Sequence, residues 1–456
     1  MNDTIAAIAT AAIPSAIGIL RLSGPESIAV IDRVFTPDRG GPMSERPDRQ
    51  LVYGTLRDAG GQAIDRCLAT VSHGPHSYTG EDTAELQCHG SPAALALGLE
   101  ALFAAGARQA LAGEFTRRAF LNGQLDLTQV EAVADLIHAG SAGAVRQAAG
   151  QLSGALSAVI GEVYDGLTDL MAHFHAVLDY PDEDIDPFEA EEISAALTAA
   201  GEKLQRLAAT YRRGRALTEG VPCAIVGRPN AGKSTLFNAL VGYDRAIVTP
   251  IPGTTRDTVE ETVTLGDTLL RLIDTAGLRD SEDAVEQLGV ERSRAALQRA
   301  ELALVLVDGS QPWVDEDLEL LRTAAAHGLT VLVYTKADLP SPRMARVPRP
   351  EGVPLVVLSA ASGQGLGELE RAVAGFFPDD PGLRPGTLLT NARQAEAAGR
   401  AQQAVARAAD ALRAGFPPDA VLTDVEEAMS ALGELTGRTV REDITSRIFE
   451  RFCVGK

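Results

Sequence analysis

A glycine-rich segment in the middle of the chain has the residue types and spacing of a phosphate-binding loop. Residues 227–234 read GRPNAGKS and match the pattern G-x-x-x-x-G-K-[ST]. They follow the apolar run 221–226 and precede the helical segment 235–240, which is the context that the pattern requires. In such a loop, backbone N–H groups bind phosphate oxygens, Lys233 reaches the β- and γ-phosphates, and Ser234 can ligate Mg²⁺. The segment therefore predicts a site for a nucleoside triphosphate.

Three later motifs, each directly after an apolar run, indicate which nucleotide is bound. DTAG at 274–277 supplies an acidic residue near Mg²⁺ and a glycine for a switch. TKAD at 335–338 ends in Asp338, whose carboxylate can accept hydrogen bonds from N1–H and N2–H₂ of guanine. SAA at 359–361 offers a backbone N–H to guanine O6. We therefore predict a GTP site formed by Asn230, Ala231, Gly232, Lys233, Ser234, Thr235, Thr249, Pro250, Ile251, Pro252, Gly253, Thr254, Thr255, Asp274, Thr275, Ala276, Gly277, Thr335, Lys336, Ala337, Asp338, Ser359, Ala360 and Ala361.

Two positions depart from the commonest form of these motifs. Thr335 stands where Asn is usual, and its hydroxyl can still brace the phosphate loop. Guanine specificity is expected to remain because Asp338 carries it, while affinity is expected to fall. Leu278 stands where many GTPases have a water-orienting Gln, and an apolar side chain cannot orient water. A catalytic group must come from elsewhere, and Asn230 and the segment 249–257 are the candidates.

The surrounding elements must hold these motifs at one edge of a sheet. Strand and helix signals alternate from 221 to about 377, whereas helical periodicity dominates on both sides of this span. Residues 1–120 alternate short apolar runs with Gly, Pro and Ser turns, which predicts a mixed α/β domain. The simplest architecture is a Ras-like P-loop domain inserted into one helical domain.

The expected fold class is therefore α/β plus all-α. The predicted segments are an N-terminal α/β domain, a discontinuous helical domain in two parts and the inserted P-loop domain, with bounds 1–120, 121–215, 216–379 and 380–456. An acidic stretch at 179–192 is interpreted as a solvated loop between helices. A metal site there is the alternative, but the spacing has no recognisable ligand pattern.

Composition narrows the classes of protein further. Of the 456 residues, 45% are hydrophobic and 23% are charged, which is typical of a globular protein. No apolar run approaches the ~20 residues of a membrane helix, and the first residues lack a basic signal-peptide region, so we expect a cytoplasmic protein without a membrane partner. The net charge of −21 disfavours unspecific nucleic-acid binding, so an RNA partner needs a local basic face. The four scattered cysteines predict neither a zinc knuckle nor a disulfide framework.

The chain resembles the MnmE (TrmE) family of tRNA modification GTPases along its whole length. The blocks outside the P-loop domain are specific to that family, whereas ribosome-assembly GTPases share only the nucleotide-binding motifs. Besides the phosphate loop, the resemblance is carried by SYTGED at 77–82, GEFTRRAFLNG at 113–123, PGTTRD at 252–257, DTAGLR at 274–279 and FCVGK at 452–456.

The resemblance implies a potassium-activated GTPase. In the family, a monovalent cation lies where other GTPases have an arginine finger, and it neutralises charge that grows between the β- and γ-phosphates. The matching K⁺ ligands are Asn230, Thr249, Ile251 and Thr254, and the Mg²⁺ ligands are Ser234 and Thr255. The family's water-orienting glutamate corresponds to Glu286. From the sequence alone, Glu286 is a carboxylate on a helix surface.

The resemblance also implies that the N-terminal domain binds 5-formyltetrahydrofolate or a related tetrahydrofolate. The family's folate contacts correspond to Arg21, Glu85, Gln124 and Lys456. Arg and Lys suit the anionic glutamyl tail, and a carboxylate suits the pterin N–H edge. Gln124 replaces a residue that is commonly basic in the family, so its contact is expected to be a neutral hydrogen bond. Without the resemblance, Arg21 and Glu85 fit an ordinary surface pair equally well.

Cys453 is a candidate nucleophile. It lies near Arg447, Arg451 and Lys456 in the sequence, and cationic neighbours lower a thiol pKa. Uridine C5 chemistry often uses addition of such a nucleophile at C6. A small packed residue is the alternative interpretation.

The implied function is GTP-driven addition of a carboxymethylaminomethyl or aminomethyl group at C5 of the wobble uridine, position 34, of certain tRNAs. The implied partners are tRNA and the flavin protein MnmG (GidA), which carries FAD, in a heterotetramer built on a homodimer of this chain. Two alternatives remain: a regulatory or ribosome-assembly GTPase without modification chemistry, and a stand-alone folate aminomethyltransferase. A pure switch leaves the folate domain unexplained, and a stand-alone transferase leaves the P-loop domain unexplained.

Overall fold

The chain divides into two compact units in the computed structural model. It describes residues 3–179, 190–243, 261–273, 295–339, 349–378, 384–438 and 455. The first unit contains Met1–Ala134 and Thr436–Lys456, and the second contains Asp135–Leu435. The boundary falls within helix α4 (Leu127–His138). The finer division at residues 120, 215 and 379 stays a prediction.

The N-terminal unit is built on a seven-stranded sheet in the order β3-β4-β5-β6-β2-β1-β7, antiparallel except for the β1–β7 pair. Along β6, Ala84, Leu86 and Cys88 are buried, whereas Glu85 and Gln87 are not. Because side chains alternate between the faces of a strand, this pattern directs Glu85 away from the core. The strands are β1 (Ile5–Ile8), β2 (Ser15–Ser23), β3 (Phe35–Pro37), β4 (Val52–Arg57), β5 (Ala63–Ser72), β6 (Thr83–Gly90) and β7 (Arg108–Gln109).

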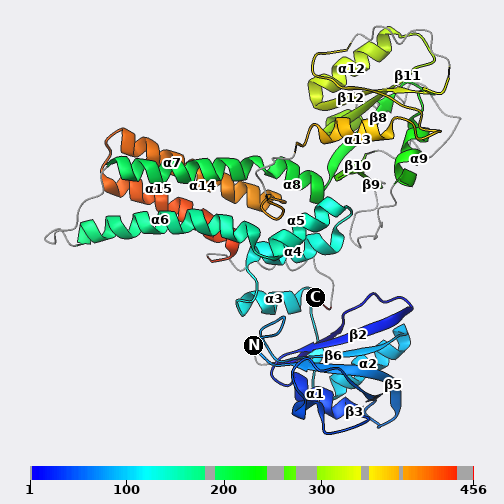
Figure 1. The fold of residues 1–456 in the computed structure, drawn as a ribbon, viewed down its shortest axis with the longest axis vertical. Coiled ribbons are helices and arrows are strands. Elements are labelled where there is room, and N and C mark those ends of the chain that lie inside the picture. The colour runs from blue at the N-terminus through cyan, green and yellow to red at the C-terminus, as the bar shows by residue number, and fades with distance from the viewer. Residues whose placement is uncertain are drawn as a thin grey trace. The chain divides into compact units, whose positions relative to one another are not determined.

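Two helices, α1 (Ser27–Val34) and α2 (Pro92–Ala104), share the apolar core of this sheet (Figure 1). Helix α2 begins with Pro92 after the N-cap Ser91, whose Oγ accepts a hydrogen bond from Ala94 N at 3.4 Å. A Cβ on Gly18 would lie only 2.4 Å from Leu95, so the glycine permits the close packing of α2 on β2. The short helices η1 (Met43–Glu45) and α3 (Glu114–Leu121) complete the unit.

In the second unit, the P-loop domain is a doubly wound α/β fold. Its six-stranded sheet has the order β13-β12-β11-β8-β10-β9, and only β9 is antiparallel to its neighbour. Separate apolar clusters cover the two faces of the sheet, one including α9 and α13 and the other including α12. The elements are β8 (Val221–Gly227), α9 (Lys233–Tyr243), β9 (Glu261–Leu265), β10 (Thr268–Leu272), β11 (Leu302–Asp308), α12 (Asp315–His327), β12 (Leu329–Thr335), β13 (Leu355–Val357) and α13 (Leu366–Ala374).

The helical elements before and after the P-loop domain form one hydrophobic core. Buried residues of α6 and α7 pack with buried residues of α14 and α15, although the P-loop domain separates the two pairs in sequence (Figure 1). This packing confirms the discontinuous helical domain. The helices are α5 (Ala142–Leu152), α6 (Ala155–Asp179), α7 (Ala190–Ala209), α8 (Tyr211–Thr218), α14 (Ala392–Arg413) and α15 (Pro418–Thr436).

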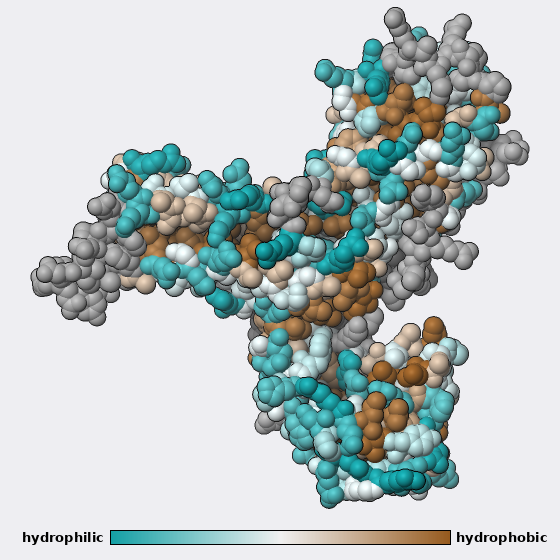
Figure 2. Space-filling model, in the orientation of Figure 1, coloured by the Kyte–Doolittle hydropathy of each residue, from teal (hydrophilic) through white to brown (hydrophobic). Residues whose placement is uncertain are grey.

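The N-terminal unit exposes several large apolar side chains. Figure 2 shows hydrophobic residues on the visible face of this unit. The exposed set is Ile13, Ile17, Leu51, Tyr53, Tyr78, Leu97, Leu111 and Leu121. Within the described ranges, no helix has the length and apolar character needed to cross a membrane.

Candidate functional site

The phosphate loop joins a buried strand to a helix at the carboxyl edge of the sheet. Strand β8 ends at Gly227, where a Cβ would lie 2.5 Å from the carbonyl oxygen of Leu306, so only glycine fits. Asn230 and Gly232 have φ values of 63° and 90°, and these left-handed residues turn the chain before α9 begins. The loop therefore presents the first turn of α9 beyond the end of β8.

Lys233 is held by the loop itself. Its Nζ donates hydrogen bonds to the carbonyl oxygens of Gly227 and Arg228, each at 2.8 Å. Burial lowers the pKa of Lys233. Within the described part of the chain no carboxylate pairs with this ammonium, and Ser234 beside it is exposed. The arrangement suits phosphate oxygens, which supply the negative charge that the loop lacks.

Thr335 connects the base-reading motif to the phosphate loop. It ends β12, is 2% exposed, and donates from Oγ1 to the carbonyl oxygen of Ala231 at 2.7 Å. The carbonyl oxygen of Val307 is the next acceptor, at 3.2 Å. The hydroxyl thus makes the bracing contact expected of a threonine at this position.

Lys336 forms an ion pair that sequence reasoning missed. Its Nζ lies 2.7 Å from Oδ2 of Asp308, the last residue of β11. Burial raises the pKa of Asp308, but the hydrogen bonds from Lys336 and Ser310 outweigh it, and the pKa is lowered overall. The sequence did not reveal this pair, because it depends on the strand register that places Asp308 beside Thr335 in the parallel sheet. The ion pair fixes the side chain of Lys336, a residue of the 335–338 motif whose φ is 57°.

Asp338 and Ser359 lie together, although they are 21 positions apart in the sequence. The hydrogen bond with the Ser359 side chain holds the pKa of Asp338 below its usual value. Asp338 is exposed, whereas Ser359 is fully buried and pairs its backbone with Gln364. Ala360 and Ala361 follow directly. The two motifs expected to read guanine therefore meet at one place.

Part of the predicted site lies outside the described residues. These positions are Thr249, Pro250, Ile251, Pro252, Gly253, Thr254, Thr255, Asp274, Thr275, Ala276, Gly277, Glu286, Cys453 and Lys456. Their assigned roles stay predictions.

Arg21 and Glu85 form an ion pair on neighbouring strands of the N-terminal sheet. Arg21 Nε donates to Glu85 Oε1 at 2.8 Å, and each side chain is about a quarter exposed. The Arg21 guanidinium lies 5.9 Å from the ring centroids of both Tyr78 and Phe115. Tyr78 Oη hydrogen-bonds Thr116 Oγ1 at 2.9 Å, and burial raises the pKa of Tyr78. The ion pair therefore lies beside two aromatic rings and is still partly exposed to solvent.

Gln124 lies on the loop after α3. A Cβ placed on Gly80 would lie 3.2 Å from Gln124 Cγ, so this side chain packs against the 77–82 loop. In the described structure it does not hydrogen-bond Arg21 or Glu85. Of the candidate folate residues that the structure describes, Arg21 and Glu85 form a pair, whereas Gln124 lies separately against the 77–82 loop.

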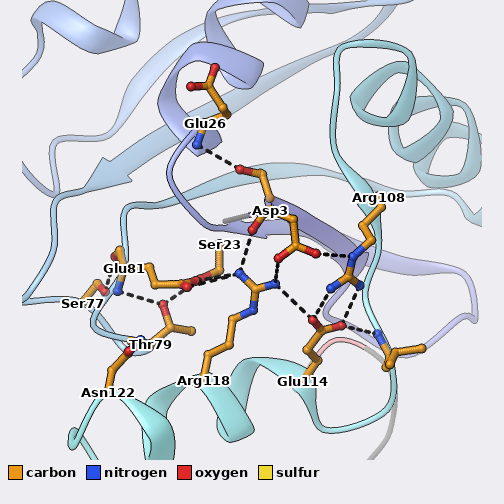
Figure 3. Close-up of polar contacts among 12 residues, drawn as sticks. Asp3, Ser23, Glu26, Ser77, Thr79, Glu81, Arg108, Glu114, Arg118 and Asn122 are labelled. Atoms are coloured by element: carbon orange, nitrogen blue, oxygen red, sulfur yellow. Dashed lines mark hydrogen bonds and ion pairs between the residues drawn. The ribbon is translucent and has the colours of Figure 1, made fainter. Parts of the chain in front are cut away.

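A buried ionic cluster ties the two N-terminal sequence blocks together (Figure 3). Arg118 is 1% exposed, and its Nη1 donates to Glu81 Oε2 at 2.9 Å and to the Asp3 carbonyl oxygen at 2.9 Å. Its Nη2 donates to Asp3 Oδ1 at 2.9 Å and to Glu114 Oε1 at 3.1 Å. Glu81 belongs to the 77–82 block and Arg118 to the 113–123 block, so this cluster links them.

Arg108 closes the other side of the cluster. It donates to Asp3 Oδ2 at 2.6 Å and to Glu114 Oε1 at 2.5 Å. Burial raises the pKa of Glu114, but the hydrogen bonds from Arg108, Leu111 N–H and Arg118 outweigh it and lower the pKa overall. The sequence did not predict this network. It contained no usable signal, because Asp3, Glu81 and Arg118 lie far apart along the chain.

One residue of the C-terminal tail packs in the N-terminal unit. Gly455 is buried with a φ of 105°, and a Cβ there would lie 2.4 Å from the carbonyl oxygen of Ile8. Ile8 pairs with Leu20, the neighbour of Arg21 in the chain. Gly455 therefore lies against the end of β1 at a position that only glycine can fill.

These features define a P-loop nucleotide-binding protein with a separate α/β N-terminal unit. Residues 127–453 match the family model described as "MnmE helical domain", and residues 4–124 match "GTP-binding protein TrmE N-terminus". The chain is 44% identical to "tRNA modification GTPase MnmE" of Symbiobacterium thermophilum, and the comparison covers 100% of both chains. It is 43% identical to the protein of the same name from a Roseiflexus species, over 100% of this chain and 99% of that one. The chain therefore belongs to the MnmE family.

The G domain of the Thermotoga maritima FeoB iron transporter is 25% identical, with a TM-score of 0.25, and the match covers 34% of this chain and 98% of that one.

Proposed function

We propose that this chain is a GTPase that takes part in modifying the wobble uridine of certain tRNAs. The observation that carries the proposal is the braced phosphate loop, with Lys233 presented by loop carbonyls and Asp338 beside Ser359. Full-length similarity to relatives named as tRNA modification GTPases supplies the biological setting.

In the proposed reaction, Lys233 and the first turn of α9 bind the phosphates of GTP, and Asp338 accepts the guanine N–H groups. The exposed Ser234 hydroxyl and Thr255 would hold Mg²⁺. Asn230, Thr249, Ile251 and Thr254 would hold K⁺, and Glu286 would orient the attacking water. Bound cations supply positive charge at the phosphates, and this charge stabilises the transition state of phosphoryl transfer. The exposed position of Asn230 in the loop is compatible with a cation ligand.

We extend the proposal to the N-terminal unit as a site for a tetrahydrofolate one-carbon donor. The Arg21–Glu85 pair, flanked by Tyr78 and Phe115, combines charge with aromatic surface, which suits a pterin and its acidic tail. Gln124 and Lys456 would add contacts, and Cys453 is the candidate nucleophile. The exposed apolar residues of this unit are consistent with a homodimer formed through it. The division into domains at 1–120, 121–215, 216–379 and 380–456 belongs to the same proposal.

The remaining chemistry would come from partners. A flavin protein, MnmG, would supply FAD-dependent redox chemistry within a heterotetramer, and tRNA would be the substrate. A cytoplasmic location follows from a tRNA substrate.

The experiment that tests the cation-assisted mechanism is steady-state GTP hydrolysis in KCl and in NaCl at equal ionic strength. Parent protein and Asn230→Ala would be compared. We expect a strong K⁺ requirement in the parent that the variant loses. Equal rates in both salts would remove K⁺ from the proposal and leave a GTPase that needs another activator.

A further inference from the structure

The residues that follow strand β11 form a turn beside the motif that is expected to read guanine. Because β11 and β12 are parallel neighbours, the register of the sheet places Asp308 beside Thr335 (Figure 1). Gly309 N donates to the carbonyl oxygen of Thr335 at 3.0 Å, and a Cβ on Gly309 would lie only 2.8 Å from that oxygen. The close approach therefore requires a glycine between Asp308 and Ser310.

The turn also orients the carboxylate of Asp308. Its Oδ1 accepts hydrogen bonds from Ser310 N at 2.9 Å and from Ser310 Oγ at 2.6 Å. The Asp308 side chain is 16% exposed, and its other oxygen, Oδ2, lies 2.7 Å from Lys336 Nζ. A hydrogen bond between charged groups is stronger where both are partly removed from water. The carboxylate is thus a preformed anchor for the lysine.

Lys336 needs such an anchor because its backbone conformation is unusual. Its φ of 57° lies in the left-handed region, which residues with a Cβ rarely adopt. Leu339 N donates to the Lys336 carbonyl oxygen at 3.0 Å, and Ala337 N donates to the Leu358 carbonyl oxygen at 3.2 Å. Residues other than glycine keep such a conformation only where the surrounding contacts determine it. Asp338 lies within this turn, so the conformation of Lys336 sets the position of the Asp338 carboxylate.

The side chain at the start of the motif is already engaged elsewhere. The Thr335 hydroxyl carries one proton, which it donates to the Ala231 carbonyl oxygen of the phosphate loop. An asparagine side chain at this position would offer two donor protons and an acceptor. The threonine braces the phosphate loop and has no second proton for the segment that follows. In the described structure, the Asp308–Lys336 ion pair supplies a side-chain contact to that segment.

We propose that Asp308 is a positioning residue for guanine recognition, because it holds, through Lys336, the turn that presents Asp338 to the base. The inference rests on the proposed function, which supplies the guanine nucleotide. It assigns a role in binding to a residue outside the nucleotide-binding motifs. Without the carboxylate, the Lys336 ammonium loses its anchor, and the turn can relax to other backbone conformations. The contacts from Asp338 to N1–H and N2–H₂ of guanine then weaken together.

The test measures the Kd of the full chain for GDP and for inosine diphosphate, which lacks the N2 amino group. Asp308→Asn keeps an oxygen that can accept from Ser310 but removes the negative charge that pairs with Lys336. Glu162→Gln is the matched control, because it removes the carboxylate partner of another lysine, Lys203, at 2.9 Å. Thermal unfolding and kcat at saturating GTP verify that both variants are folded.

We expect Asp308→Asn to bind GDP about three- to tenfold more weakly than the parent does. The preference for GDP over inosine diphosphate should fall about two- to threefold, because a displaced Asp338 gains less from the N2 amino group. KM for GTP should rise while kcat is kept, and the control should keep the parental values. An unchanged Kd for GDP, or an equal loss for both nucleotides, would overturn the proposal.

A second variant tests the path through Lys336. Lys336→Met removes the ammonium and keeps a side chain of similar length, so Asp308→Asn should have little further effect on GDP binding in this background. An equal loss in both backgrounds would show that Asp308 does not act through Lys336 and would overturn the proposal. A parent protein that does not bind GDP would overturn the inference and the proposed GTPase together. Parental GDP binding with an unaffected Asp308→Asn variant would overturn only the inference.

Discussion

Two buried or partly buried cations in this molecule, Arg118 and Lys233, have different kinds of hydrogen-bond partner and therefore different expected roles. In the N-terminal unit, Arg118 is buried and each of its terminal nitrogens donates to acidic partners. In the P-loop domain, Lys233 is held, among the residues that the structure describes, only by neutral carbonyls of its own loop. A cation that already has its anions stabilises a fold, whereas a cation held by dipoles remains able to bind an incoming anion. The partners of a charged side chain, rather than its presence in a conspicuous motif, therefore indicate its role.

The largest effect is expected when the buried ionic cluster of the N-terminal unit loses Arg118, its central cation. Arg118→Met leaves Asp3, Glu81 and Glu114 without their shared donor, and breaking a buried ion pair in this way costs about 3–5 kcal/mol. Hydrogen exchange of amides in β2 and β6 measures the loss of stability in the N-terminal unit. Arg117→Met is the matched control, because Arg117 lies on the same helix and is only partly buried. Equal protection in Arg118→Met and Arg117→Met would show that the cluster does not hold the fold.

Removal of the Lys233 ammonium should lower the rate of GTP hydrolysis and leave the free energy of unfolding unchanged. Lys233→Ala takes away the ammonium expected to meet the phosphates, and loss of such a group lowers kcat by about 10²–10³-fold. Steady-state GTP hydrolysis measures the effect. Lys203→Ala removes an exposed lysine from α7, where it pairs with Glu162 at 2.9 Å, and should leave the rate unchanged. A Lys233→Ala variant that keeps the parental rate but unfolds more readily would reverse the proposed distinction.

The brace between the two nucleotide motifs is expected to have a smaller effect. Thr335→Val preserves the shape of the side chain but leaves the Ala231 carbonyl without its donor, at a cost of about 1–2 kcal/mol. The Kd for a fluorescent GDP analogue should rise about five- to thirtyfold. Thr335→Ser keeps the hydroxyl and should bind almost as well as the parent. Equal weakening by valine and serine would assign the effect to packing.

The smallest expected effect is the loss of stability that mild acid causes in the N-terminal unit through its buried ionic cluster. The pKa values of Asp3 and Glu114 lie below their usual 3.8 and 4.5. Carboxyls whose pKa is lowered by folding add stability that is complete above the unfolded values and lost as pH falls through the folded ones. The stability of the N-terminal unit should therefore be level from pH 8 to about 5 and decline below about 4. Hydrogen exchange at several pH values checks this, and an unchanged stability at lower pH would contradict it.

Much of the P-loop domain was predictable because its motifs follow strands in a fixed order. The strand before Gly227, the bracing role of Thr335 and the insertion into a helical domain all follow from local pattern. The Arg118 cluster was not predictable, because it joins residues 3, 81, 114 and 118, whose proximity depends on the register of the sheet. The pairing of Lys336 with Asp308 likewise depends on a contact between strands that are distant in sequence. Periodicity indicates which face of an element is buried, but it does not say which elements meet.

Asp338, beside Ser359, is expected to read guanine at the nucleotide site. The most direct test of this role is the affinity of the parent protein and of Asp338→Asn for GDP and for xanthosine diphosphate. The parent should prefer GDP, and Asp338→Asn should lose about ten- to a hundredfold for GDP while gaining affinity for the xanthine nucleotide, because an amide can donate to its extra oxygen. Equal binding of both nucleotides by the parent, or an unchanged preference in the variant, would show that Asp338 does not read guanine.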